Sequence, residues 1–136
     1  MTQGGVQTVG CSNPRYSNGA RRRANRNRLR AEGRGCWICR AFGRPDAIDY
    51  SLPARHPLSF EMDELVPVSR YWLGGYPSKE ACALDYSNCD ATHRCCNNWR
   101  KAKTVEEVLM IARGTRGGSA KGKPFIPGEV EQPVEF

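Results

Sequence analysis

The chain has 136 residues and lacks several features that define common classes of protein. No window approaches the roughly 20 apolar residues that a membrane helix needs, so we expect no membrane partner. No apolar run of the signal-peptide type precedes the cysteines, which predicts a chain that stays in the reducing cytoplasm. Only 39% of the residues are hydrophobic, and a chain of this length supports one core. We therefore expect a single domain with a thin core.

Cysteine is the residue that can stabilise such a core. The chain holds seven cysteines, an odd number that cannot all pair as disulfides. In a reducing compartment, cysteines that cluster with histidine are metal ligands more often than disulfide partners. The composition therefore predicts a metal site.

Positive charge is concentrated towards the N-terminus. The net charge is +7, and residues 11–44 hold ten arginines against a single acid, Glu32. A planar guanidinium can give two hydrogen bonds to phosphate oxygens and release condensed counterions. The arginine-rich stretch also lacks the apolar stripe of a membrane-surface helix. This pattern predicts nucleic acid as the partner.

Composition divides the chain into three parts. Residues 1–19 are rich in Gly, Ser, Asn and Gln and are expected to form a disordered arm, and residues 114–136 a loose Gly-, Lys- and Pro-rich tail. Residues 20–113 are expected to form the folded domain.

Local patterns predict an α+β domain. We expect an arginine-rich helix, a β-hairpin of two short strands bounded by prolines, a helix capped by Ser78, a helix that begins at Asp90, and a further turn after Thr104. The corresponding ranges are 20–31 for the first helix, 47–50 and 60–66 for the hairpin strands, 79–84, 90–103 and 105–111. The tryptophans are expected to be buried around the metal site and the helix: Trp37, Trp72 and Trp99.

The positions of two cysteine and histidine pairs along the chain predict a structural zinc site with four ligands. Cys36 and Cys39 are separated by two residues, which lets both thiolates reach one tetrahedral ion from a tight turn. His93 and Cys96 are three residues apart and would share one face of the predicted helix. These four ligands leave no position open for water, so the ion would contribute to folding rather than to catalysis.

Two neighbouring cysteines leave an alternative ligand set open. Cys89 lies one turn before His93, and Cys95 adjoins Cys96, so a set made only of cysteines is possible. We favour His93 and Cys96, because Cys95 would point about 100° away around a helix.

A second group of polar residues follows the segment Cys36-Trp37-Ile38-Cys39, which we call the Cys-x-x-Cys knuckle. Asp63 and Glu64 lie in the segment Phe-Glu-Met-Asp-Glu-Leu-Val-Pro-Val-Ser at 60–69, and Asn88 and Asn97 come later. Together with the knuckle, this arrangement resembles the HNH endonuclease family, and most closely its phage-borne branch. The resemblance covers about residues 36–103. It implies a small ββα-metal (HNH) domain, a β-hairpin plus helix, stapled by zinc.

The resemblance also implies roles for individual residues. Asp63 would be a metal-ligating carboxylate and Asn97 the helix-borne ligand of a catalytic Mg²⁺ or Mn²⁺. Asn88 matches the loop asparagine that orients the general base through its backbone or amide. These residues and Glu64 are the catalytic candidates.

Glu64 departs from the family pattern, because it stands where the family has its general-base histidine. A carboxylate can act as the base, or it can be a second oxygen ligand of the ion. A third interpretation is an acidic pair at a strand edge that takes no part in catalysis.

The resemblance implies a divalent-metal-dependent DNA endonuclease, with the packaging terminase of a phage as a further partner. Residues on the arginine-rich helix and around the last helix would hold the DNA backbone: Arg21, Arg22, Arg23, Arg94, Arg100 and Lys101. Two alternatives are a zinc-binding DNA adaptor that kept the fold and lost the chemistry, and a zinc-ribbon regulatory protein.

Overall fold

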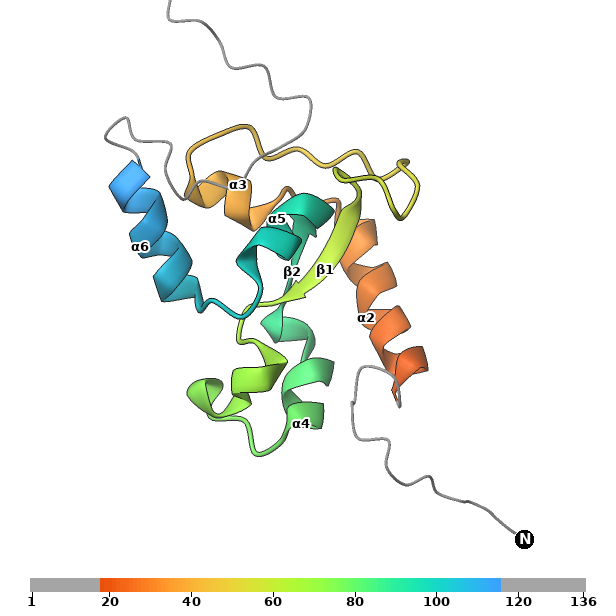
Figure 1. The fold of residues 1–136 in the computed structure, drawn as a ribbon. Coiled ribbons are helices and arrows are strands. Elements are labelled where there is room, and N and C mark those ends of the chain that lie inside the picture. The colour runs from red at the N-terminus through yellow and green to blue at the C-terminus, as the bar shows by residue number, and fades with distance from the viewer. Residues whose placement is uncertain (1–17, 116–136) are drawn as a thin grey trace, which may run out of the picture.

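A computed structural model describes residues 18–115 of the chain. In chain order, the elements are α2 (Gly19–Glu32), α3 (Trp37–Ala41), β1 (Phe60–Glu64), the 3-10 helix η1 (Val68–Gly74), α4 (Lys79–Leu84), the 3-10 helix η2 (Tyr86–Asn88), β2 (Cys89–His93), α5 (Arg94–Arg100) and α6 (Val105–Thr115). The two strands lie at the centre with the helices around them (Figure 1). The described chain is a small α+β domain. The predicted arm and tail lie outside the described residues, except at their inner ends.

The sheet consists of β1 and β2 in antiparallel pairing, with Phe60 opposite His93 and Glu64 opposite Cys89. The strand predicted over 60–66 is confirmed over 60–64. The predicted hairpin is wrong, because residues 47–50 form no strand and β1 pairs with a segment that we expected to be helical. The loop of the predicted hairpin, residues 51–59, therefore precedes β1, and residues 65–88 connect β1 to β2.

The segment 89–93 is a strand because tertiary packing overrides its local helical signals. Cys89 and Ala91 are buried against Leu29 and Met62 in one core cluster. Asp90 does not cap a helix; its carboxylate accepts hydrogen bonds from the backbone N–H of Ala91 and from Arg34. The helix predicted over 90–103 is confirmed only for α5.

Two other predicted helices are confirmed. Ser78 caps α4 by accepting a hydrogen bond from the backbone N–H of Ala81 at 3.1 Å. Thr104 and Glu107 form a reciprocal capping box at the start of α6, with bonds of 3.0 and 2.8 Å. These caps satisfy backbone donors that a helix leaves unpaired in its first turn.

The arginine-rich helix α2 lies along one side of the sheet (Figure 1) and ends at Gly33, which adopts a left-handed φ of 63°. Leu29 is its one buried residue. Arginines supply other contacts: the guanidinium of Arg28 lies 3.9 Å from the centre of the Tyr86 ring, and that of Arg30 lies 5.5 Å from the Phe60 ring. Cation–π stacking therefore helps to attach the helix in place of an apolar stripe.

Most of the buried hydrophobic residues fall into two clusters. One joins α3, α5 and α6, and the other joins α2 to the sheet. Trp37 is buried in the first cluster and Trp99 packs against it, as expected. The expectation was wrong for Trp72, whose residue surface is 60% exposed on η1. Its ring packs edge-on against Tyr71 alone among the described aromatic rings.

Candidate metal centre and acidic cavity

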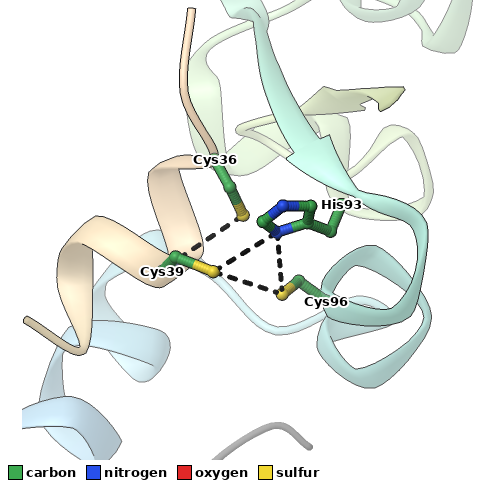
Figure 2. Close-up of side chains that lie close together, drawn as sticks. All are labelled: Cys36, Cys39, His93 and Cys96. Atoms are coloured by element: carbon green, nitrogen blue, oxygen red, sulfur yellow. Dashed lines mark hydrogen bonds between the residues drawn. The ribbon is translucent and has the colours of Figure 1, made fainter. Parts of the chain in front are cut away.

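Four side chains converge between α3, the end of β2 and the start of α5 (Figure 2). Cys36 is the N-cap of α3 and Cys39 lies within that helix, whereas His93 ends β2 and Cys96 lies in the first turn of α5. All four are buried, and their ligand atoms lie within 4.8 Å of one another. We call this group the Cys3His cluster.

The cluster has the dimensions of a tetrahedral zinc site. Zinc bonds of about 2.3 Å to sulfur and about 2.0 Å to nitrogen place neighbouring sulfurs about 3.8 Å apart and a nitrogen about 3.6 Å from a sulfur. The Sγ atoms of Cys39 and Cys96 are 3.8 Å apart, and Nδ1 of His93 lies 3.4 and 3.9 Å from them. The cluster can therefore hold a structural metal such as zinc.

The structure favours the predicted ligands over the neighbouring cysteines. Cys95 is half-buried beside the cluster, and Cys89 is buried in the core beneath α2. One detail of the prediction was wrong: His93 and Cys96 do not share a helix face. His93 reaches the cluster from the end of a strand, and the turn into α5 brings Cys96 to the same point.

Hydrogen bonds hold the ligands in position. Nε2 of His93 lies 3.1 Å from the carbonyl oxygen of Ala47, so a proton on Nε2 can be donated there while Nδ1 faces the cysteines. The backbone N–H of Cys39 donates to Sγ of Cys36 at 3.4 Å. Residues 47–50 do not form the predicted strand, but the backbone carbonyl of Ala47 helps to orient a ligand of the cluster.

A positive charge lies against the cluster. Nε and Nη2 of Arg44 donate to the Sγ atoms of Cys39 and Cys96 at 3.4 and 3.6 Å. Hydrogen bonds from Cys36 and Cys96, together with Arg44, lower the pKa of Cys39 to about 3. The thiolate, which is the form that binds a metal, is therefore favoured.

A cavity of about 480 Å³ lies between the end of β1 and the end of α5, the helix that carries Cys96. We call it the acidic cavity, because Asp63 and Glu64 are among the residues that line it. The full lining is Asp63, Glu64, Pro67, Val68, Ser69, Lys79, Asn97, Asn98, Lys101 and Ala102. Three of the four predicted catalytic residues therefore lie at one cavity.

Asp63 is held by two donors from different helices. Nε1 of Trp37 and Nη1 of Arg100 donate to Oδ2, at 2.8 and 2.5 Å, and Oδ1 accepts no hydrogen bond from the described residues. Burial raises the pKa of Asp63 to about 6, although the Arg100 charge opposes that rise. Asp63 is therefore fixed in position with one oxygen left for another ligand.

Glu64 is bound to the arginine-rich helix. Nη2 of Arg22 donates to Oε2 of Glu64 at 2.7 Å, and the Glu64 side chain is only 2% exposed. Nε of Arg22 is buried and has no hydrogen-bond partner among the described residues. This contact joins α2 directly to the acidic cavity.

Asn88 makes hydrogen bonds to the backbone that follows β1. Its Oδ1 accepts from the backbone N–H of Val66 at 2.8 Å, its Nδ2 donates to the Val66 carbonyl at 3.1 Å, and its own carbonyl accepts from Leu65 at 2.7 Å. Asn88 is buried and does not line the cavity. It therefore fixes the chain just after Glu64.

Asn97 lines the cavity from α5, and its Nδ2 donates to Oε1 of Glu61 at 2.9 Å. With the amide nitrogen held by Glu61, the amide oxygen is the atom of Asn97 that can serve as a metal ligand. Asp63 and Asn97 thus line the same cavity.

The residues predicted to bind DNA differ in exposure. Arg21, Arg23 and Lys101 are exposed, whereas Arg22 binds Glu64 and Arg94 forms an ion pair with Glu61. The prediction was wrong for Arg100, which is 0% exposed. Its guanidinium is enclosed by Asp63 and by backbone carbonyls, those of Glu64, Leu65 and Lys103.

Sequence reasoning missed the contacts that three residues make at these sites. Trp37 and Arg44 act through contacts that join distant segments, and Lys79 reaches the cavity from α4. The position of Trp37 inside the Cys-x-x-Cys knuckle was the one local signal, because a residue there must lie beside the metal cluster.

No protein-family model, curated protein or solved structure matches this chain. Within residues 18–115, no helix is long and apolar enough to cross a membrane. The functional interpretation therefore depends on the cluster, the cavity and the elements that carry them.

Proposed function

We propose that the chain is a divalent-metal-dependent DNA endonuclease of the HNH type, stapled by zinc at the Cys3His cluster. One observation carries this proposal: Asp63 and Glu64 at the end of β1 and Asn97 on α5 line the same cavity. The order β1, loop with Asn88, β2, α5 is also the order that a ββα-metal domain requires. The Cys3His cluster lies at the β2–α5 junction and would hold this arrangement together.

The donor set of the cavity suits a hard divalent cation such as Mg²⁺ or Mn²⁺. Oδ1 of Asp63 and the amide oxygen of Asn97 would hold it, since carboxylate, amide and water oxygens are the ligands that such ions prefer. When bound, the ion would act as a Lewis acid on the scissile phosphate. Trp37 and Arg100 would keep Asp63 in place.

Glu64 is the remaining acid among the lining residues and would take the proton from the attacking water. Its Oε2 is occupied by Arg22, which orients the carboxylate. Asn88 fixes the backbone two residues further on and is a positioning residue.

DNA would lie across the cavity and α2. Exposed arginines on α2, Arg21 and Arg23, would contact backbone phosphates, which fix register without reading sequence. We therefore expect little sequence preference. We also propose that the protein acts inside a host cell beside a phage packaging terminase, which is what the family resemblance implies.

The test is nicking of supercoiled plasmid by zinc-loaded protein with Mg²⁺ or Mn²⁺. Wild type should nick, and Glu64→Gln should be slower by about 100-fold or more, because the amide cannot accept the proton. Glu106→Gln, an exposed change on α6, is the matched control and should nick like wild type. Equal rates for wild type and Glu64→Gln would exclude Glu64 as the base.

A zinc-binding DNA adaptor is a second candidate, favoured by one observation. Both acids of the cavity are paired with arginines, Asp63 with Arg100 and Glu64 with Arg22, and each pair reduces the negative charge that attracts a cation. In the same assay, a silent wild type and an active Glu64→His protein would identify the adaptor.

A further inference from the structure

Lys101 has a backbone conformation that normally belongs to glycine. Its φ of 53° is the one positive value at a non-glycine residue in the described part of the chain, and its ψ is −125°. Residues 100–103 form a β-turn closed by a hydrogen bond from the Lys103 N–H to the Arg100 carbonyl at 3.1 Å. These angles match the second residue of a type II′ turn, where a side chain is strained and glycine dominates.

The turn itself has a structural purpose that does not need a lysine. It brings the Lys103 carbonyl to Nε of Arg100 at 2.9 Å, which helps to satisfy the buried guanidinium. Backbone atoms make these bonds, so glycine at position 101 would serve them without strain. The lysine side chain must therefore be explained by something else.

Lys101 lines the acidic cavity together with Asp63, Glu64 and Asn97. Both acids are paired with arginines. The backbone N–H of Lys101 donates to the Asn97 carbonyl, but its ammonium group makes no hydrogen bond or ion pair within residues 18–115. A cation beside neutralised acids, at the wall of a cavity, is suited to an anionic ligand. Strained residues at such positions are retained when the strain serves a function.

We propose that Lys101 binds a phosphate group of the DNA backbone at the acidic cavity, and that its strained conformation is retained for this contact. The inference rests on the proposed function, because it names a residue that holds the substrate of that site. Its ammonium group would hold the phosphodiester against Asp63 and the end of β1.

The test compares full-length, zinc-loaded wild type, Lys101→Gly and Lys101→Arg in two measurements. The first is the melting temperature. Lys101→Gly should melt about 4–8 °C higher than wild type, because it removes the strain, whereas Lys101→Arg should melt like wild type.

The second measurement is affinity for a labelled DNA duplex of random sequence without added divalent metal, as a function of salt. Lys101→Gly should bind about tenfold more weakly, with a salt-dependence slope smaller by about 0.9. Lys101→Arg should keep both the affinity and the slope, and Arg113→Gln, an exposed change on α6 that does not touch the cavity, should match wild type.

A Lys101→Gly protein that binds DNA as tightly as wild type would overturn the phosphate contact, as would a Lys101→Arg protein that binds as weakly as the glycine variant. An unchanged melting temperature in Lys101→Gly would overturn the strain argument. A wild type that binds DNA without nicking it contradicts the nuclease proposal alone, and a wild type that binds no DNA overturns both.

Discussion

The Cys3His cluster and the acidic cavity both use residues of α5 but are built on different principles. The cluster gathers four soft donors that are buried and directed at one point. The cavity gathers hard oxygen donors that remain at its surface and are held by arginines, Arg22 and Arg100. The four side chains of the cluster fill every coordination position of a tetrahedral ion. The donors of the cavity would leave coordination positions open for water or substrate.

This difference separates stability from chemistry. A closed tetrahedral site has no position for a substrate, so its metal contributes to folding. An open site needs its charged groups fixed before the metal or substrate arrives, and buried ion pairs do this at a cost in desolvation. We therefore expect loss of a cluster ligand to destroy the fold, and loss of an oxygen donor that faces the open positions of the cavity to spare it.

The largest effect is expected from the cluster. Cys36→Ser should release zinc and unfold the domain, because a thin core depends on the metal and the cost is several kcal/mol. Zinc content by elemental analysis and far-UV circular dichroism measure the two results. Cys95→Ser, next to a ligand in sequence, is the control and should keep both zinc and fold; full zinc content in Cys36→Ser would contradict the ligand assignment.

The next effect concerns the ion pair beneath the cavity. Arg100→Met should destabilise the protein by about 3–5 kcal/mol in chemical denaturation, because Asp63 is then left buried without its partner. The double variant Arg100→Met with Asp63→Asn should recover part of this loss. Equal destabilisation in the single and double variants would mean that the pair is not coupled.

A smaller effect is expected at the edge of the cluster. Arg44→Gln should weaken zinc affinity by about 10–100-fold in a competition titration with a chelator, because the thiolates lose a positively charged donor. Arg40→Gln, an exposed change on α3, is the comparison and should bind zinc like wild type. An Arg44→Gln protein with wild-type affinity would remove Arg44 from the site.

The smallest effect depends on pH. Asp63 has a pKa of about 6 in the folded protein, above its ordinary value of 3.8, so the folded state holds this proton more tightly than the unfolded chain does. Its contribution to stability is present below about pH 4 and is lost as the pH rises through 6. Between pH 5 and 7, wild type should lose about 1 kcal/mol relative to Asp63→Asn. Parallel stability curves for the two proteins would contradict the raised pKa.

The metal cluster could be predicted because its signals are local. The two-residue spacers before Cys39 and before Cys96 bring each pair of ligands together through a short turn. That holds whether His93 lies on a helix or at the end of a strand, so an error in secondary structure did not affect the ligand set.

Pairing and burial could not be predicted in the same way. Residues 89–93 form a strand because β1 lies beside them, and nothing within those five residues indicates this. Arg100 is buried because three backbone carbonyls and Asp63 surround it, and a positive charge in a sequence otherwise indicates a surface. Both depend on contacts between distant segments.

The most direct test of the account is nicking by zinc-loaded wild type and Asp63→Asn during titration with Mg²⁺ or Mn²⁺. We predict that nicking by wild type rises with the added ion and saturates, and that Asp63→Asn keeps its zinc and fold but does not nick at any ion concentration. Nicking by Asp63→Asn at the wild-type rate, or no nicking by wild type, would contradict the account.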